Sequence, residues 1–230
     1  MIESEEINGL QIYPFKSSYE LMDFIEDKKT ILIAVNAEKI ISKQQDIKKI
    51  INKNIGYPDG YGAVLALKSK GIHSRKIAGC ELWLEIIEKN LNKNFYFIGS
   101  TDEVLNKCIQ KLKKNYAGIR IAGYRNGFLE SEGEEELKNQ LLKHKPDFVF
   151  VAMGSPRQEL LMENLIKIFP TMYMGLGGSF DVYSGSTKRA PKLFIRLNLE
   201  FLWRRLAQPF KFNRIWALII FGYNLLMRRL

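Results

Sequence analysis

Two short apolar runs that each end in a glycine-containing turn constrain the fold of this chain more than any other feature. Residues 147–159 read DFVFVAMGSPRQE, and residues 172–181 read MYMGLGGSFD. Apolar runs of this length between chain breakers predict buried strands of a parallel sheet. Ligands of open α/β sheets bind just beyond the carboxyl ends of such strands. The two turns are therefore candidate ligand-binding loops.

The two turns combine glycines with polar side chains. Glycine lets the backbone approach a ligand closely, and its N–H group suits a phosphate oxygen. One such turn alone is explained as an ordinary connection between a strand and a helix. Two neighbouring turns that carry polar side chains favour a ligand-binding site. The glycines are Gly154, Gly175, Gly177 and Gly178, and the polar residues on or beside the turns are Gln158, Asp181, Lys188 and Arg189.

Further apolar runs alternate with segments of helical periodicity. Strands are predicted over 30–35, 95–98 and 119–122, with an edge strand over 9–15. Helices are predicted after Ser17 or Ser18, between the 30–35 strand and about residue 53, and over 63–70, 80–90, 102–116 and 131–144, the last opened by a capping box at Ser131. This alternation predicts an α/β fold with a Rossmann-like, mainly parallel sheet and helices on both faces.

The formal net charge of +10 is concentrated at the C-terminal end. Residues 188–230 contain ten lysines and arginines and a single acid, Glu200, so the rest of the chain is close to neutral. The shift predicts an α/β domain over 1–190 and a basic, helical C-terminal appendage over 191–230. A basic segment of this kind implies an anionic partner, either nucleic acid or a membrane surface.

The appendage alternates apolar clusters with arginines at helical spacing, over 193–206 and again over 210–230. A basic, aromatic-rich amphipathic helix is typical of a segment that lies on a membrane, where each Lys or Arg adds ~1 kcal/mol of attraction. The alternatives are a helix packed on the core with solvated arginines and a nucleic-acid-binding segment, although no recognition module is evident. The apolar run over 215–227 is shorter than the ~20 residues that span a bilayer.

The sequence lacks the motifs that are typical of several kinds of metal site and enzyme. Cys80 and Cys108 stand in no metal-binding or disulfide pattern and are expected to be reduced thiols of the core. The chain has no nucleophile elbow, zinc-protease motif or Walker loop, and the turn after 172–174 does not match the dinucleotide fingerprint. No acid pair follows a strand where it would hold a metal-bound sugar nucleotide. We therefore expect no metal and no cofactor, and expect Lys188, Arg189 and the basic appendage to stabilise a departing diphosphate.

Asn36 and Asp59 are candidate polar residues at one edge of the predicted sheet. Asn36 follows the 30–35 strand, where asparagine is also a good helix N-cap. Asp59 stands between Pro58 and Gly60, and Asp-Gly is a common turn pair. Each residue taken alone fits its structural role, but the strand–helix alternation places both at the carboxyl side of the sheet. A carboxylate there can accept a proton from a sugar hydroxyl, which contributes about 10²–10⁴-fold to a rate.

Many short motifs of this chain, in order from about residue 9 to residue 214, resemble the WecG/TagA/CpsF family of bacterial glycosyltransferases (family 26). These motifs are NAEK at 36–39, Asp59-Gly60, AGCELW at 78–83, GYRNG at 123–127, AMGSPRQE at 152–159, GGSFDV at 177–182, KRAP at 188–191 and LEFLWRRLAQP at 199–209.

The resemblance implies a metal-independent, inverting enzyme that moves an N-acetylmannosamine-type sugar from a UDP donor to a GlcNAc-diphospho-polyprenol acceptor. Asp59 matches the family's proposed general base, Asn36 and Gln158 match its pocket residues, and Asp181 falls where the nucleotide is expected. The appendage matches a segment that docks on the membrane and closes over the site, which implies a peripheral protein at the cytoplasmic face. The residues expected to bind substrate are Lys76, Gly154, Gly177, Gly178, Asp181, Lys188, Arg189, Arg205 and Arg214.

The motifs look most like the WecG branch, whose donor sugar is N-acetylmannosaminuronic acid in the enterobacterial common antigen pathway. The TagA branch transfers N-acetylmannosamine during synthesis of the teichoic acid linkage unit. TagA-like members carry threonine where this chain has Ala34, which argues against a TagA-type site. Where the family usually has an arginine, this chain has Lys76 with Arg75 beside it, so the cation that faces the substrate stays open.

Two other functions stay open at this stage. One keeps the family but uses a different UDP-hexose donor, for capsule or teichoic acid linkage synthesis. The other is a non-catalytic basic protein that binds a membrane or nucleic acid, whereas the enzyme is expected to have no nucleic-acid partner. The sequence does not reveal the oligomeric state, and a homo-oligomer is one of the open arrangements.

Overall fold

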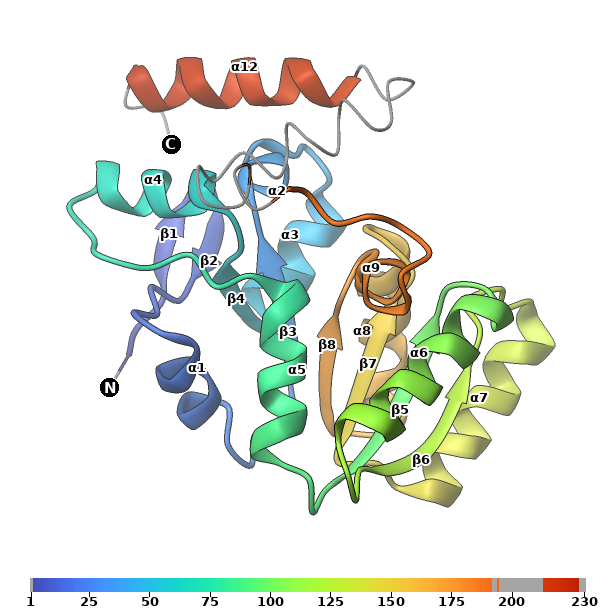
Figure 1. Ribbon diagram of the computed structural model, residues 1–230. Coiled ribbons are helices and arrows are strands. Elements are labelled where there is room, and N and C mark those ends of the chain that lie inside the picture. Colours follow the sequence, from blue (N-terminus) through green and yellow to red (C-terminus); the bar gives the residue numbers. More distant parts are fainter. Residues whose placement is uncertain (1, 192–193, 195–212, 228–230) are drawn as a thin grey trace.

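The computed structural model describes residues 2–191, 194 and 213–227, and its main body is built on one parallel sheet (Figure 1). Within the described residues this sheet has six strands in the order β4-β3-β8-β7-β5-β6, and every neighbouring pair is parallel. The strands are β3 (Ile31–Val35), β4 (Ile55–Pro58), β5 (Asn94–Gly99), β6 (Arg120–Arg125), β7 (Phe148–Ala152) and β8 (Met172–Gly175). The predicted α/β fold is confirmed.

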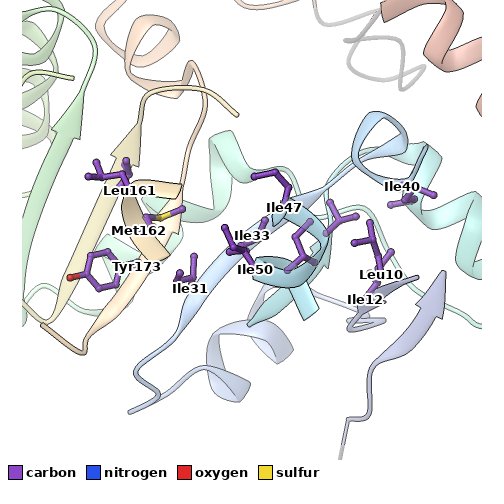
Figure 2. Packing of buried hydrophobic residues seen from close by; sticks show 14 of the residues in the cluster. Leu10, Ile12, Ile31, Ile33, Ile40, Ile47, Ile50, Leu161, Met162 and Tyr173 are labelled. Atoms are coloured by element: carbon purple, nitrogen blue, oxygen red, sulfur yellow. The ribbon is translucent and has the colours of Figure 1, made fainter. Parts of the chain in front are cut away.

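Alternate side chains of the strands pack into two separate cores, because successive residues of a strand point to opposite faces. Ile31 and Ile33 belong to the first core, part of which Figure 2 shows, and Leu32 belongs to the second. Burial on both faces explains why the strands read as continuous apolar runs. Helices that cover the first core are α3 (Gln45–Asn52), α7 (Ser131–His144) and α8 (Arg157–Ile168), and those that cover the second are α1 (Ser18–Phe24), α5 (Gly79–Lys89) and α6 (Asp102–Asn115).

Trp83 of α5 lies at the centre of the second core. Its side chain is fully buried and stands edge-on to Phe150 of β7, with the ring centroids 5.8 Å apart. Phe180 of α9 (Ser179–Ser184) packs against the same indole at 5.7 Å. Aromatic pairs of this kind contribute about 0.5–1.5 kcal/mol beyond the area that they bury. The cluster therefore fixes α5 and α9 against the sheet, and both helices begin at its carboxyl edge.

The predicted edge strand over 9–15 is present, but it is shorter and does not belong to the main sheet. Leu10–Ile12 forms β2, which pairs with β1 (Glu5–Ile7) as a separate antiparallel, two-stranded sheet. The connection is Asn8-Gly9, and both residues have positive φ, at 50° and 76°. Asn-Gly is the residue pair that two-residue hairpin turns favour most, so the sequence contains the signal for this hairpin.

Three other elements differ from the sequence-based expectation. The pattern does not predict β4, which reads IGYP and is buried throughout. The single helix expected up to about residue 53 is two helices, α2 (Ala37–Ile41) and α3, because the chain turns extended at Ser42. The capping box at Ser131 is also wrong, since Glu130 occupies the N-cap position of α7 and makes no side-chain cap hydrogen bond.

The C-terminal helix α12 (Asn213–Leu226) packs on α2 and α4 (Tyr61–Ser69) (Figure 1). Phe221 is only 5% exposed and joins the first core. The predicted C-terminal helix is thus present, while the domain boundary near residue 190 stays a prediction. Residues 195–212, which include the predicted substrate-binding Arg205, lie outside the described residues. None of the helices described here has the length and apolar character needed to cross a membrane.

Candidate active site

The parallel sheet brings the polar turns together, because the carboxyl ends of all its strands meet at one edge. Asn36 follows β3, Asp59 follows β4, and Gly154 and Gly177 lie in the turns after β7 and β8. The strand order β4-β3-β8-β7 therefore places Asp59, Asn36, Gly177 and Gly154 in that order along the edge. Neighbouring strands are ~4.8 Å apart, so the turn after β8 lies roughly 10 Å from Asp59 along the sheet.

A cleft of about 290 Å³ opens at this edge, beyond the ends of β5, β6, β7 and β8. It lies where the chain leaves β5 and β7 toward opposite faces, with α6 on the second core and α8 on the first. Such switch points are the usual ligand sites of open α/β sheets. The cleft brings together four predicted residues, Gly154, Gly177, Gly178 and Asp181, and its other lining residues are Ser100, Gly127, Phe128, Ala152, Met153 and Arg157.

The glycine turns present bare backbone to the cleft. Gly154 and Gly177 have positive φ, at 76° and 59°, and a Cβ built on either residue would meet no heavy atom within 4 Å. The Gly177 N–H group, however, donates to Oε1 of Gln158 at 2.9 Å. This N–H is therefore engaged inside the protein, and the expectation that it offers a bond to phosphate does not fit the structure.

Six cleft residues were not predicted from the sequence, and three of them have polar or aromatic side chains: Ser100, Phe128 and Arg157. Ser100 donates a hydrogen bond from its hydroxyl to Oδ1 of Asp181 at 3.2 Å, which links the turn after β5 to α9. Phe128 is 69% exposed, although it is a large apolar residue. Arg157 is the first residue of α8, so it adds positive charge at a helix N-terminus. Only the folded arrangement shows that these three residues share one cleft.

Asp59 lies outside the lining of that cleft, at the N-terminus of α5. Its Oδ1 atom accepts a hydrogen bond from the Gly79 N–H group at 3.2 Å, and its own N–H donates to the Val35 carbonyl at 2.9 Å. A helix N-terminus favours a negative charge beside it. The Tyr57 hydroxyl is buried against Gly79, where an added Cβ would lie 2.6 Å from the Tyr57 oxygen. Burial, and then the charge of Asp59, raise the pKa of Tyr57 well above its ordinary value.

The predicted cations are distributed around Asp59 and the C-terminal segment. Arg189 forms an ion pair with Glu81, two residues after the glycine that binds Asp59, whereas Lys188 is exposed. Lys76 is half-buried and precedes Ile77, whose N–H group donates to the Pro58 carbonyl at 2.9 Å, whereas Arg75 is exposed. The backbone of Arg214 belongs to α12.

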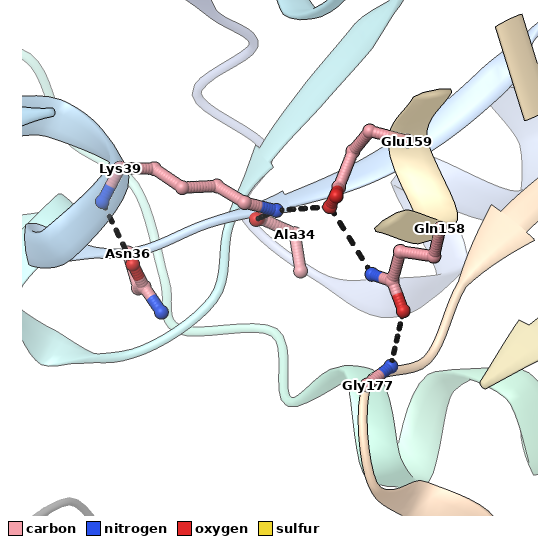
Figure 3. A network of polar contacts seen from close by, with 6 residues as sticks. All are labelled: Ala34, Asn36, Lys39, Gln158, Glu159 and Gly177. Atoms are coloured by element: carbon pink, nitrogen blue, oxygen red, sulfur yellow. Dashed lines mark hydrogen bonds and ion pairs between the residues drawn. The ribbon is translucent and has the colours of Figure 1, made fainter. Parts of the chain in front are cut away.

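Asn36 and Gln158 are linked through a partly buried network, which Figure 3 shows. Asn36 caps α2, and its Oδ1 accepts from the Lys39 N–H group at 3.1 Å. Lys39 Nζ contacts Glu159 Oε1 at 2.8 Å, and Glu159 Oε1 accepts from Gln158 Nε2 at 3.1 Å. The network joins α2, which follows β3, to α8, which follows β7, so Asn36 and the cleft belong to one connected edge.

Among the residues that the structure describes, no group of three or more His, Cys, Asp or Glu side chains is arranged to hold a metal ion. Cys108 is buried, and burial raises the pKa of its thiol to about 12. Cys80 is partly exposed, so the expectation that both thiols lie in the core holds for Cys108 alone.

A parallel α/β sheet with a glycine-lined cleft at its carboxyl edge is the arrangement in which open α/β proteins bind their ligands. The model of the glycosyl transferase WecG/TagA/CpsF family matches residues 7–230, and the chain belongs to this family of glycosyltransferases. A relative from Bacillus spizizenii is 32% identical over 227 residues, which cover 93% of this chain and 87% of the relative. That relative is named N-acetylglucosaminyldiphosphoundecaprenol N-acetyl-beta-D-mannosaminyltransferase.

Gly99, at the end of β5, supports the cleft, and we predict that Gly99→Ala is strongly destabilising. Its φ is 135°, and an added Cβ would lie 2.2 Å from the Ala152 carbonyl oxygen. Steric overlap and backbone strain are expected to cost about 3 kcal/mol or more in the free energy of unfolding, measured with urea. The matched control is Gly118→Ala, where φ is 83° and the space is open, with an expected cost of about 1–2 kcal/mol. Equal losses in the two variants would contradict this reading of the β5–β7 contact.

Proposed function

We propose that this glycosyltransferase moves an N-acetylmannosamine-type sugar from a UDP donor to a GlcNAc-diphospho-polyprenol acceptor, in the synthesis of a bacterial cell-surface polysaccharide. The observation that carries the proposal is the cleft at the carboxyl edge of the sheet, with Asp59 on the same edge. The name of the Bacillus spizizenii relative supports the acceptor and the class of sugar.

The nucleotide of the donor binds in the cleft. The exposed ring of Phe128 offers a stacking surface for the base, and Asp181 offers a carboxylate to hydroxyl or N–H groups of the nucleoside. Arg157, at the N-terminus of α8, and the backbone of the Gly154 and Gly178 turns suit the diphosphate. With the nucleotide there, the sugar extends toward the ends of β8, β3 and β4, where Gln158, Asn36 and Asp59 lie.

Two donor sugars are favoured by different observations. The NAEK motif at 36–39 and Ala34 favour N-acetylmannosaminuronic acid, which is our first choice. The name of the relative favours N-acetylmannosamine, which is the alternative within the same family.

A panel of UDP-sugars tests the reaction and the choice of donor together. With a GlcNAc-diphospho-polyprenol analogue as acceptor, we expect transfer from UDP-N-acetylmannosaminuronic acid to be faster than from UDP-N-acetylmannosamine, as measured by chromatography of the labelled lipid product. Faster transfer of the neutral sugar would reverse the choice of donor. Failure of every donor with a panel of acceptors would contradict the proposed reaction.

Asp59 acts as the general base in an inverting, metal-independent transfer. The acceptor 4-hydroxyl loses its proton to Asp59 as its oxygen forms a bond to the anomeric carbon, and the bond from that carbon to the diphosphate breaks. The electron pair leaves with UDP. Lys76, Lys188, Arg189, Arg205 and Arg214 are proposed to offset the charge of the substrates and of the departing UDP. The Arg189–Glu81 pair supports this role by holding a guanidinium near the Asp59 loop.

Asp59→Asn is predicted to lower turnover by about a hundredfold or more. The asparagine Oδ1 can still accept from the Gly79 N–H group, so we expect the fold and UDP affinity to be retained. Steady-state kinetics, with circular dichroism and UDP titration as controls, measure the effect. Near-normal transfer by a folded Asp59→Asn protein would remove this carboxylate from the role of base.

Phe128→Ala is predicted to weaken UDP binding by about fivefold or more, because the base would lose its stacking partner. Tyr124→Ala is the matched control, since Tyr124 is also exposed (45%) and lies on β6 but does not line the cleft. Calorimetric titration of UDP compares the two variants. Equal affinities would remove Phe128 from the nucleotide site, and no binding of UDP by the unchanged protein would favour the non-catalytic alternative.

The enzyme is proposed to work as a peripheral protein on the anionic cytoplasmic face of the membrane, where a water-soluble donor meets a lipid-borne acceptor. Apolar side chains of α12 and its end are exposed, although the helix also packs on α2 and α4. These residues are Ile219, Ile220, Tyr223, Leu226 and Met227. Together with the basic composition of the appendage, they suit a segment at the lipid headgroups.

Replacing Ile219, Ile220 and Leu226 by serine is predicted to reduce co-sedimentation with vesicles of anionic phospholipid. The control variant replaces Leu142 and Ile168, which are similarly exposed (47% and 41%) on α7 and α8, and should sediment like the unchanged protein. Unchanged sedimentation of the α12 variant would contradict a lipid-facing role for this helix.

A further inference from the structure

The ion pair between Lys39 and Glu159 is buried more deeply than any other ion pair found within the described residues. The Glu159 side chain is 0% exposed and that of Lys39 is 11% exposed. Lys39 lies in α2, which follows β3, and Glu159 lies in the first turn of α8, which follows β7. Because β8 lies between β3 and β7 in the sheet, the pair links elements on the two sides of β8. Figure 3 shows the pair together with Gln158 and Gly177.

The ion pair determines how the Gln158 amide is oriented. Oε1 of Glu159 accepts from both Lys39 Nζ, at 2.8 Å, and Gln158 Nε2, at 3.1 Å. A carboxylate accepts hydrogen bonds and donates none, so it selects the NH₂ side of the amide. Burial opposes ionisation of Glu159, but the charge of Lys39 and the hydrogen bonds outweigh it and hold the pKa of Glu159 below its ordinary value.

The oriented amide in turn holds the turn after β8. With its NH₂ group on Glu159, Gln158 presents Oε1 to the Gly177 N–H group at 2.9 Å. A flipped amide would place two donors against each other. The Gln158 side chain also packs on Gly175, where an added Cβ would lie 2.6 Å from Nε2. Gly177 and Gly178 line the cleft, so their position depends on the orientation of a side chain beneath them.

A buried ion pair is weak evidence of a purely stabilising role. Replacing a buried ion pair by apolar side chains of similar volume is often neutral or stabilising, because burial removes both charges from water. A buried amide with two distinct ends has a different requirement, because it needs an acceptor at its NH₂ group, here Glu159, and a donor at its oxygen, here the Gly177 N–H group.

We propose that Lys39 and Glu159 are positioning residues for the donor: they orient the Gln158 amide and thereby hold the Gly177–Gly178 turn in the shape that binds the nucleotide. This inference rests on the proposed function, in which UDP occupies the cleft.

The test is UDP titration of the double variant Lys39→Met/Glu159→Met, which removes both charges and keeps similar volumes. We expect a folded protein whose UDP affinity falls by about fivefold or more, because the amide loses its fixed acceptor. The donor KM should rise while the acceptor KM stays within twofold. The matched control is Glu163→Met/Lys167→Met, which removes a more exposed ion pair within α8. This control should bind UDP like the unchanged protein.

Repeating the double substitution in a Gln158→Met protein shows whether Lys39 and Glu159 act through the Gln158 amide or have a general structural role. If the ion pair acts through the amide, adding the two methionine changes to Gln158→Met should weaken UDP binding by less than a further twofold. Full additivity, or unchanged affinity of the double variant, would overturn the inference. No UDP binding by the unchanged protein would overturn the proposed donor together with it.

A second double variant tests the same inference if Lys39→Met/Glu159→Met does not fold. Lys39→Met/Glu159→Gln keeps a polar group beneath the turn, but its neutral amide both donates and accepts and so does not fix Gln158. The same fall in UDP affinity is expected, and normal affinity would overturn the inference.

Discussion

The structure depends on one constraint: all six strands of the main sheet described here are parallel, so their carboxyl ends share one edge. Residues far apart in the chain, such as Asn36, Asp59 and Gly177, become neighbours along that edge only for this reason. The two hydrophobic cores fix the sheet from both faces. The polar turns at the edge are thereby held on a rigid base, as ligand sites of α/β proteins require.

The edge divides into two parts with different chemistry. The cleft beyond β5 to β8 combines bare glycine backbone, an exposed aromatic ring and an arginine, which suits a nucleotide. The ends of β3 and β4 carry Asn36 and the carboxylate of Asp59, which suits proton transfer. The Lys39–Glu159–Gln158 network connects the two parts beneath the surface. This division matches a reaction in which one end of the donor is held while its other end reacts.

Much of the sheet could be predicted from the sequence, because strands buried on both faces leave apolar runs such as 30–35 and 148–152. The short strand β4 could not, since Gly56 and Pro58 are poor strand formers and its pairing with β3 decides its structure. The cleft glycines and Asp181 could be predicted from their turns. Phe128, Arg157 and the Lys39–Glu159 pair could not, because their positions depend on how separate loops and helices pack together.

The central claim is that the nucleotide lies in the cleft and the sugar lies toward Asp59. A structure of the protein with a non-hydrolysed UDP-sugar analogue tests this claim most directly. The account predicts the nucleotide in the cleft between the Gly154 and Gly177 turns, with the anomeric carbon directed along the sheet edge toward Asp59. A nucleotide bound away from this cleft, or a sugar that extends toward β6 and leaves Asp59 without access to the reacting atoms, would contradict it.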